Sequence, residues 1–169
     1  MTGDRSLSWS SVPGTIRALG RWITIVQLVG YTASLVFIRH TTGMTPAVVV
    51  TRYRGSDPDA AEGAMQFAKS FSEMLTVTHT HLFSMAAIFV FSGLGLALCA
   101  RPSEPWRRIL IVEPFVALLV SFSAMWLMRY ADPRFSWLLA VSSGLMAITF
   151  YVQSFLILRE LMTRSPVAA

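Results

Sequence analysis

The sequence predicts an all-α integral membrane protein: a four-helix transmembrane bundle with an extracytoplasmic amphipathic helix between the first and second spans. Two observations predict this class. Of the 169 residues, 54% are hydrophobic and only 14% are charged, whereas a soluble domain keeps about a quarter of its residues charged. The charges also gather in short segments and leave four long apolar runs, at about 22–38, 82–100, 109–128 and 136–158.

Each of the four runs is long enough to cross a bilayer as a helix. A hydrocarbon core of about 30 Å needs roughly 17 to 25 apolar residues in helical form. Lipid offers the backbone no hydrogen-bond partners, so a span is a helix or part of a closed barrel, and these runs are too long and too uniformly apolar for barrel strands. The first run has a basic leader, but no signal-peptide cleavage site follows it, so we interpret it as a retained span. We expect a single membrane domain over residues 1–169.

The segment between the first two runs is the one long connection, and it predicts an amphipathic helix over about 57–78. Ser56 or Asp57 can cap the start of this helix, and Pro58 suits its first turn. Apolar residues then recur at helical spacing with polar residues between them, namely Ala64, Met65, Ala68, Phe71, Met74 and Leu75. No proline or glycine interrupts residues 64–92, so this helix can continue into the second span.

The other two connections are short. In the segment 101–108, Ser103 can cap the third span and Pro105 suits its first turn. The segment 129–135 predicts a tight turn, and aromatic residues flank it at the level expected for lipid headgroups, namely Trp126, Tyr130 and Trp137.

The distribution of basic residues predicts how the protein is oriented. With four spans, both termini lie on one side of the membrane. That side carries eight of the fourteen Lys and Arg residues, and the rule that cytoplasmic loops are positive gives little weight to the long 39–78 segment. We therefore expect cytoplasmic termini in a bacterial inner membrane, because thirteen arginines against one lysine are typical of a GC-rich bacterial genome. The net charge of +5 then reflects topology and contacts with anionic lipid, and nucleic acid is not an expected partner.

All three histidines lie near the predicted extracytoplasmic face. His40 ends the first span, and His79 and His81 begin the second. Met44 follows His40 by four residues, and Met85 follows His81 by four, so the second pair shares one face of a helix. Imidazole and thioether groups together suit copper, especially Cu(I).

Two other interpretations of the histidines stay open. His40 together with His79 or His81 could supply the two axial ligands of one b-type haem. Alternatively, the histidines are interfacial residues that form hydrogen bonds with neighbouring side chains, namely Thr76, Thr78, Thr80 or Glu73. His79 and His81 stand about 200° apart on a helix, so both can point at one centre only if the helix starts between them.

Glu113 is the one acid inside an apolar run, and Pro114 follows it. It can act as a proton or ion carrier, or it can be a structural acid that pairs with Arg101, Arg108 or Arg159. The uncharged polar residues within the spans are explained by hydrogen bonds between helices; they are Gln27, Ser121, Ser123, Thr149, Tyr151 and Gln153. Cys99 is the sole cysteine, so no internal disulfide can form, and a small buried apolar role is expected.

Three short stretches resemble a family pattern: YRG at 53–55, KSFSEML at 69–75 and THTHLF at 78–83. The pattern is similar to one in a poorly characterised family of small four-span bacterial inner-membrane proteins, with Met74 here where leucine is expected. The resemblance covers about thirty of the 169 residues and implies the four-span architecture. It draws attention to five residues, namely Arg54, Lys69, Glu73, His79 and His81.

No motif in the sequence matches a nucleotide loop, a Ser/His/Asp or Cys/His arrangement, or HExxH. We therefore expect a non-enzymatic accessory subunit of a larger membrane complex, respiratory or otherwise redox-linked, whose partners are other membrane subunits. The alternative is a small transporter or channel, or a metal-handling membrane protein. The single intramembrane acid and the lack of an inverted repeat weaken the transporter alternative.

Overall fold

A computed structural model describes residues 7–56 and 65–163, and the regular structure in these residues is helical throughout. The helices are α1 (Gly14–Thr41), α2 (Pro46–Arg54), α3 (Phe71–Ala97), α4 (Glu104–Tyr130) and α5 (Phe135–Met162). Four of them, α1, α3, α4 and α5, are long and apolar enough to cross a membrane, which confirms the predicted four-helix transmembrane bundle. Each has 27 or 28 residues. At 1.5 Å per residue each is about 40 Å long and exceeds the hydrocarbon thickness.

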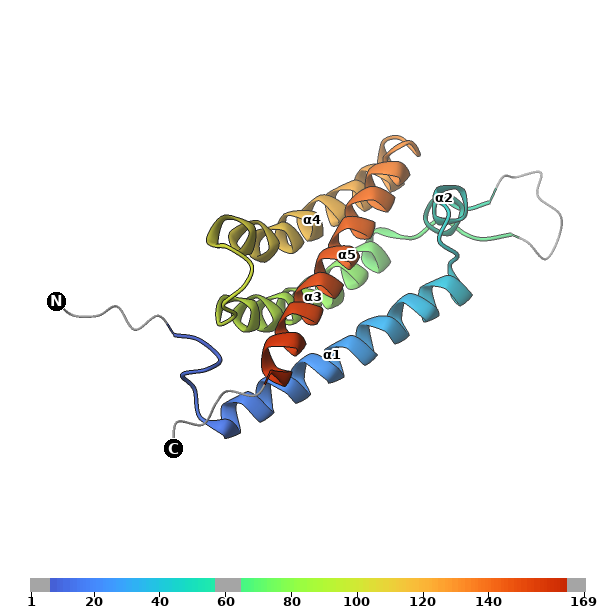
Figure 1. The fold of residues 1–169 in the computed structure, drawn as a ribbon. Coiled ribbons are helices and arrows are strands. Elements are labelled where there is room, and N and C mark those ends of the chain that lie inside the picture. The colour runs from blue at the N-terminus through green and yellow to red at the C-terminus, as the bar shows by residue number, and fades with distance from the viewer. Residues whose placement is uncertain (1–6, 57–64, 164–169) are drawn as a thin grey trace, which may run out of the picture.

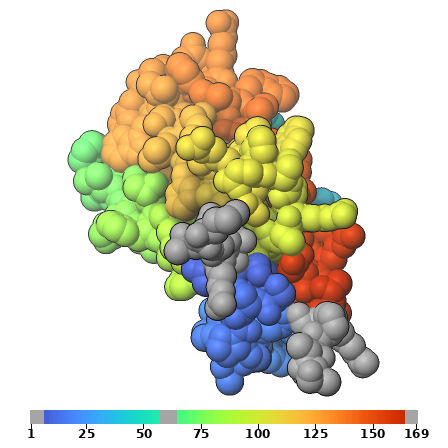
Figure 2. All heavy atoms as spheres, turned by 60° about the vertical axis from the view of Figure 1, so that its left-hand side comes forward, coloured from blue at the N-terminus to red at the C-terminus, as the bar shows by residue number. Residues whose placement is uncertain are grey.

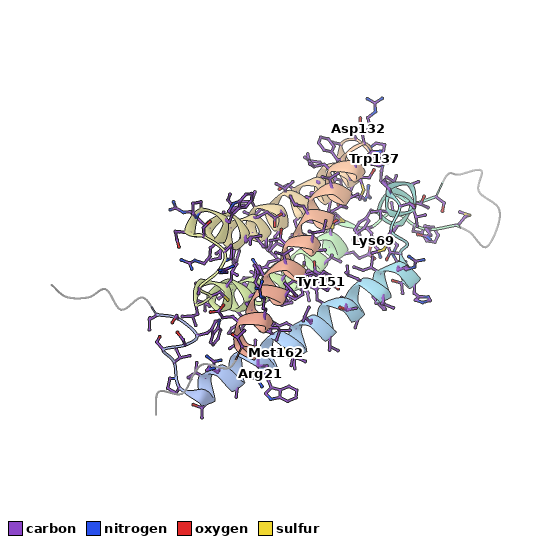
Figure 3. The ribbon with its side chains drawn as sticks, viewed as in Figure 1. Arg21, Lys69, Asp132, Trp137, Tyr151 and Met162 are labelled. Carbon is purple, nitrogen blue, oxygen red and sulfur yellow. The ribbon has the colours of Figure 1, made fainter. Side chains whose placement is uncertain are left out.

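The helices alternate in direction, so the bundle has two distinct ends (Figure 1). The start of α1, the α3–α4 connection and the end of α5 lie at one end, which we name the terminal end. The short helix α2 and the α4–α5 turn lie at the other, which we name the α2 end. Figure 3 shows Arg21 and Met162 at the terminal end, and Lys69, Asp132 and Trp137 at the α2 end.

Helix α1 is the peripheral member of the bundle. Only 11% of its most apolar segment is buried inside the protein, against 39% for α5. Figure 2 shows the N-terminal part of the described chain, including the beginning of α1, in blue at the lower edge of the molecule, beside the end of α5. The packed part of the bundle is therefore made by α3, α4 and α5.

The buried core has three layers along the bundle. The middle layer contains Tyr31, Phe89 and Phe150, with the rings of Tyr31 and Phe150 stacked at 4.4 Å between centroids. The layer near the α2 end is sulfur-rich, with Met74, Met125 and Met128 buried together. The layer near the terminal end contains the buried side chains of Trp9, Leu96, Cys99, Ile157 and Leu161. The prediction that Cys99 is a buried residue is confirmed.

Two polar contacts fix the register of α4 against α5. The hydroxyl oxygens of Ser121 and Ser142 are 2.7 Å apart. Two to three turns nearer the terminal end, Gln153 Nε2 donates to the carbonyl oxygen of Leu110 at 2.5 Å. Both pairs belong to the same antiparallel register, which places Glu113 at the level of Phe150.

The predicted amphipathic helix over 57–78 differs from the structure. Residues 65–70 are not helical, so the prediction of a helix there is wrong, and residues 57–64 lie outside the described part of the chain. The helix begins at Phe71 and runs without a break into the second span. Ser70 ends the non-helical segment because its side chain and that of Glu73 form a reciprocal capping box.

The short helix between the first two spans lies earlier in the chain. Helix α2 begins after Thr45, whose hydroxyl accepts a hydrogen bond from the Val48 amide, and Pro46 occupies its first position. Valine-rich sequence normally favours strands. Here the cap and the proline provide a helix start, and two of the valines pack on the methionine layer beneath.

Candidate functional site

Four charged residues of the α2 end join the long connection to the bundle, and we name this set the loop clamp: Arg54, Lys69, Glu73 and Arg129. Arg54 Nη1 donates to the carbonyl oxygen of Met128 at 2.9 Å, in the last turn of α4. Arg129 Nε donates to the carbonyl oxygen of Lys69 at 2.8 Å. Lys69 Nζ lies 2.7 Å from Glu73 Oε1. Arg54 and Lys69 belong to the family pattern, and their hydrogen bonds attach the connection to the end of α4. The last carbonyls of a helix lack partners within the helix, so the Met128 carbonyl is available to Arg54.

Two backbone hydrogen bonds join the end of α2 to the segment before α3. The Lys69 amide donates to the Tyr53 carbonyl, and the Ser56 amide donates to the Gln66 carbonyl, each at 2.9 Å. Between them Gly55 adopts φ +94°, a conformation that L side chains rarely adopt. A Cβ atom at Gly55 would lie 3.0 Å from the Gln66 carbonyl oxygen and 3.1 Å from the Ala68 amide nitrogen. The glycine of the YRG stretch is therefore required by backbone geometry.

An open hollow of about 340 Å³ lies beside the loop clamp, lined by Arg52, Gln66, Phe67, Ala68, Lys69 and Glu73. In α2, burial raises the pKa of the Tyr53 phenol, although the Arg52 cation acts in the opposite direction. Of the family pattern, the hollow is lined by Lys69 and Glu73, at the predicted extracytoplasmic surface.

The structure places the three histidines at separate exposed positions. His40 lies in the last turn of α1, and His79 and His81 lie in the third turn of α3 on different faces of that helix. His81 Nδ1 is 3.0 Å from the Val77 carbonyl oxygen, and the His79 ring makes an edge contact with Phe83 at 5.3 Å between centroids. Each α3 histidine therefore has a partner on its own helix.

The methionines proposed as metal ligands have different surroundings. Met44 is exposed, whereas Met85 packs against the middle layer of the core. Within residues 7–56 and 65–163, no group of three or more His, Cys, Asp or Glu side chains could hold a metal ion. The haem and copper interpretations of His40, His79 and His81 stay predictions.

A second candidate site lies inside the membrane, at Glu113. Both carboxylate oxygens of Glu113 are buried and have no hydrogen-bond partner in the described part of the protein. The expected pairing with Arg101, Arg108 or Arg159 is therefore wrong. Glu113 lies nine residues into α4, roughly 14 Å from the start of the helix, whereas those arginines belong to the terminal end.

One turn from Glu113 along the bundle lies Gln153 of α5, whose role follows from Pro114. A proline lacks an amide hydrogen, so the carbonyl four residues earlier, that of Leu110, loses its helical donor. Gln153 Nε2 supplies the missing donor at 2.5 Å. Sequence reasoning explained Gln153 only as one of several residues that bond between helices. The position of Pro114 identifies the free carbonyl, but only the α4–α5 register identifies its donor.

Comparison with known proteins agrees with this architecture. A family model described as a transmembrane helical domain, Aq_1264_TM, matches residues 43–168, which contain α2, α3, α4 and α5. No curated protein matches the chain, and no solved structure matches it. The matched region covers about three quarters of the sequence, so the chain belongs to the Aq_1264_TM family of transmembrane helical domains.

Proposed function

We propose that this chain is a non-enzymatic accessory subunit of a larger membrane complex, and that α1 is the helix that contacts its partners. The observation that carries the proposal is the uncovered face of α1. Gly30, Ala33 and Ser34 are exposed in the middle of this helix. A Cβ atom added at Gly30 would meet nothing within 4 Å, so no part of the described chain covers this face.

A face of this kind suits a second transmembrane helix. Lipid tails are as apolar as leucine, so helices associate in the membrane through close packing, and small residues let two backbones approach each other. The hydroxyl of Ser34 already donates to the Gly30 carbonyl at 3.0 Å. The face therefore presents small groups with satisfied hydrogen bonds, which favours a tightly packed helix of another subunit.

The opposite edge of α1 supports the same proposal. The hydroxyls of Thr32 and Tyr151 lie 2.8 Å apart in an exposed contact between α1 and α5, and Figure 3 shows Tyr151 on α5. This hydrogen bond fixes α1 to the bundle at mid-span. The family match begins at residue 43, so α1 lies outside the matched region.

The orientation of the subunit is part of the proposal. Cytoplasmic termini in a bacterial inner membrane would place the loop clamp and the hollow on the extracytoplasmic side. Three arginines at the terminal end donate to backbone carbonyls: Arg17 to Trp9, Arg21 to Leu161 and Arg107 to Cys99. Arginines ordered at one end of the bundle are consistent with the excess of positive charge that cytoplasmic loops carry. The redox link of the complex rests on the three histidines.

Purification of the tagged protein from its native membrane in mild detergent tests the proposed function. We expect other membrane proteins to co-purify with the wild-type chain and to be lost from a Gly30→Leu variant. Gly144→Leu is the matched control, because Gly144 is also exposed and a Cβ there also meets nothing within 4 Å. A wild-type chain that purifies as a stable monomer, or only with copies of itself, would contradict the proposal.

A further inference from the structure

Four side-chain oxygens in the described part of the protein are buried without a hydrogen-bond partner. They belong to three residues on two neighbouring helices: both carboxylate oxygens of Glu113, the amide oxygen of Gln153 and the hydroxyl oxygen of Ser154. Gln153 is 0% exposed and Ser154 is 1% exposed. Buried polar atoms normally have hydrogen-bond partners. Four buried oxygens without partners in one region therefore point to a missing ligand.

The packing of α4 on α5 brings these groups to similar depth. The amide nitrogen of Gln153 is bonded to the Leu110 carbonyl, one turn before Glu113 on the same helix. The same register sets Glu113 at the level of Phe150, one turn from Gln153 and Ser154. Tyr31 of α1 stacks on Phe150 and lies within electrostatic range of Glu113. The three residues therefore lie at similar depth inside the bundle, within about one helical turn of one another along its axis.

The described spans contribute no cation at this level, because residues 22–38, 82–97, 109–128 and 136–158 contain no Lys, Arg or His. The titratable group that α1 contributes is Tyr31, and α5 contributes Tyr151. The apolar part of α3, residues 82–97, contains no titratable residue. A carboxylate without a counter-charge is strongly disfavoured in such surroundings, so Glu113 must be neutralised by a bound cation.

We propose that Glu113, with Gln153 beside it, forms an intramembrane binding site for one exchangeable proton. Binding adds the proton to one oxygen of Glu113 and converts the carboxylate into a neutral carboxylic acid. Its O–H is then a donor of the kind that the Gln153 amide oxygen lacks. A hard metal cation such as Mg²⁺ or Ca²⁺ takes about six or more oxygen ligands, and the four unpartnered oxygens here are too few.

Labelling with dicyclohexylcarbodiimide tests the proposal, because this apolar reagent reacts with protonated carboxyl groups in apolar surroundings. Purified full-length protein is treated with the reagent, and the modified residue is identified by mass spectrometry. We expect one adduct on Glu113, with a labelling rate that falls as the pH is raised. The adduct should be lost in Glu113→Gln and unchanged in Glu104→Gln, which removes an exposed acid from the same helix.

A second measurement remains informative if a variant folds poorly. The infrared carbonyl band of a protonated carboxylic acid should be present in the wild-type protein and should disappear with rising pH. Absence of both the band and the adduct would overturn the proposal, as would labelling of Glu113 that does not change with pH. Protection from labelling by NaCl but not by choline chloride, at constant pH, would show that the bound ion is Na⁺ and would also overturn it. These outcomes are independent of whether partner subunits bind α1.

Discussion

Gln153 shows how a side chain on one helix can replace a backbone hydrogen bond on another. Pro114 leaves the Leu110 carbonyl of α4 without its helical donor, inside a region where water and lipid supply none. The amide nitrogen of Gln153, from α5, supplies that donor. The proline is therefore tolerated in the span because a specific residue of the neighbouring helix compensates for it.

A double-mutant cycle tests this pairing. Gln153→Leu should lower the free energy of unfolding in detergent by about 1 kcal/mol, the size typical of a hydrogen bond between membrane helices. Pro114→Ala restores the helical donor to the Leu110 carbonyl, so Gln153→Leu should cost much less in that background. Equal losses in both backgrounds, measured by the unfolding midpoint, would show that the two residues are not coupled.

Gly55 carries a steric requirement that its neighbours do not share. Gly55→Ala forces a Cβ onto a backbone with φ +94° and into contact with Gln66 and Ala68. Gly55 has φ +94° and ψ 166°, a region used almost only by glycine. Another residue there costs about 1–3 kcal/mol, and we expect a loss of stability of this size. Gly144→Ala is the control, because that site has open space around it. Thermal unfolding of both variants in one detergent gives the comparison, and equal midpoints would refute the requirement.

The three histidines yield a spectroscopic prediction. If His40 and His81 hold a haem, the protein from its native membrane shows a Soret band that His40→Ala and His81→Ala both lose. If the histidines and Met85 hold copper, elemental analysis gives stoichiometric copper without a Soret band. If material that retains its natural partners contains neither, the histidines act through local contacts, such as those of His81 with Val77 and His79 with Phe83.

Among the helices, α2 and the segment after it depend on the bundle to hold their position. Helix α2 has nine residues, which is too short to be stable alone in water. It packs on the methionine layer through Val49, Val50 and Tyr53. The loop clamp adds polar contacts to the ends of α4 and α3. The clamp therefore helps to hold α2 and residues 65–70 against the bundle.

Removal of Arg54 tests the clamp. Arg54→Ala deletes the hydrogen bond to the Met128 carbonyl, so we expect faster cleavage of the 42–70 connection by added protease. Arg52→Ala is the matched control, because it removes the same charge from the same helix at an exposed position that lines the hollow. If the two variants are cleaved at the same rate, charge rather than the specific contact accounts for the effect.

The sequence predicted the four spans well because each is a long run without charges, and the bilayer permits few alternatives to a helix. The segment 65–70 was missed because its apolar residues happen to follow helical spacing. The capping-box signal, Ser70 followed by Glu73, was present and marks the true helix start. The lack of a hydrogen-bond partner for the Glu113 carboxylate could not be predicted, because it depends on which side chains of α5 and α1 lie at the same depth in the bundle.

In the whole molecule, α3, α4 and α5 pack tightly together, whereas α1 is the least buried span. The family match spans the packed helices α3, α4 and α5 together with α2. The less buried α1 lies before it and joins the bundle through contacts such as those of Tyr31 and Thr32. The proposed proton site lies on the packed side and the proposed partner face on α1. A change at one can therefore be studied without removing the other.

The direction in which the whole bundle crosses the membrane is open to a single labelling experiment. Cys99 is the sole cysteine and is buried, so Cys99→Ala provides a background for new cysteines. Ser103→Cys and Ala131→Cys each place a thiol at an exposed position, in the α3–α4 and α4–α5 connections respectively. A membrane-impermeant maleimide added to intact spheroplasts should label the cysteine at 131, and should reach the one at 103 only after permeabilisation. The opposite pattern would place the loop clamp, the hollow and the histidines on the cytoplasmic side, and the proposed orientation would be wrong.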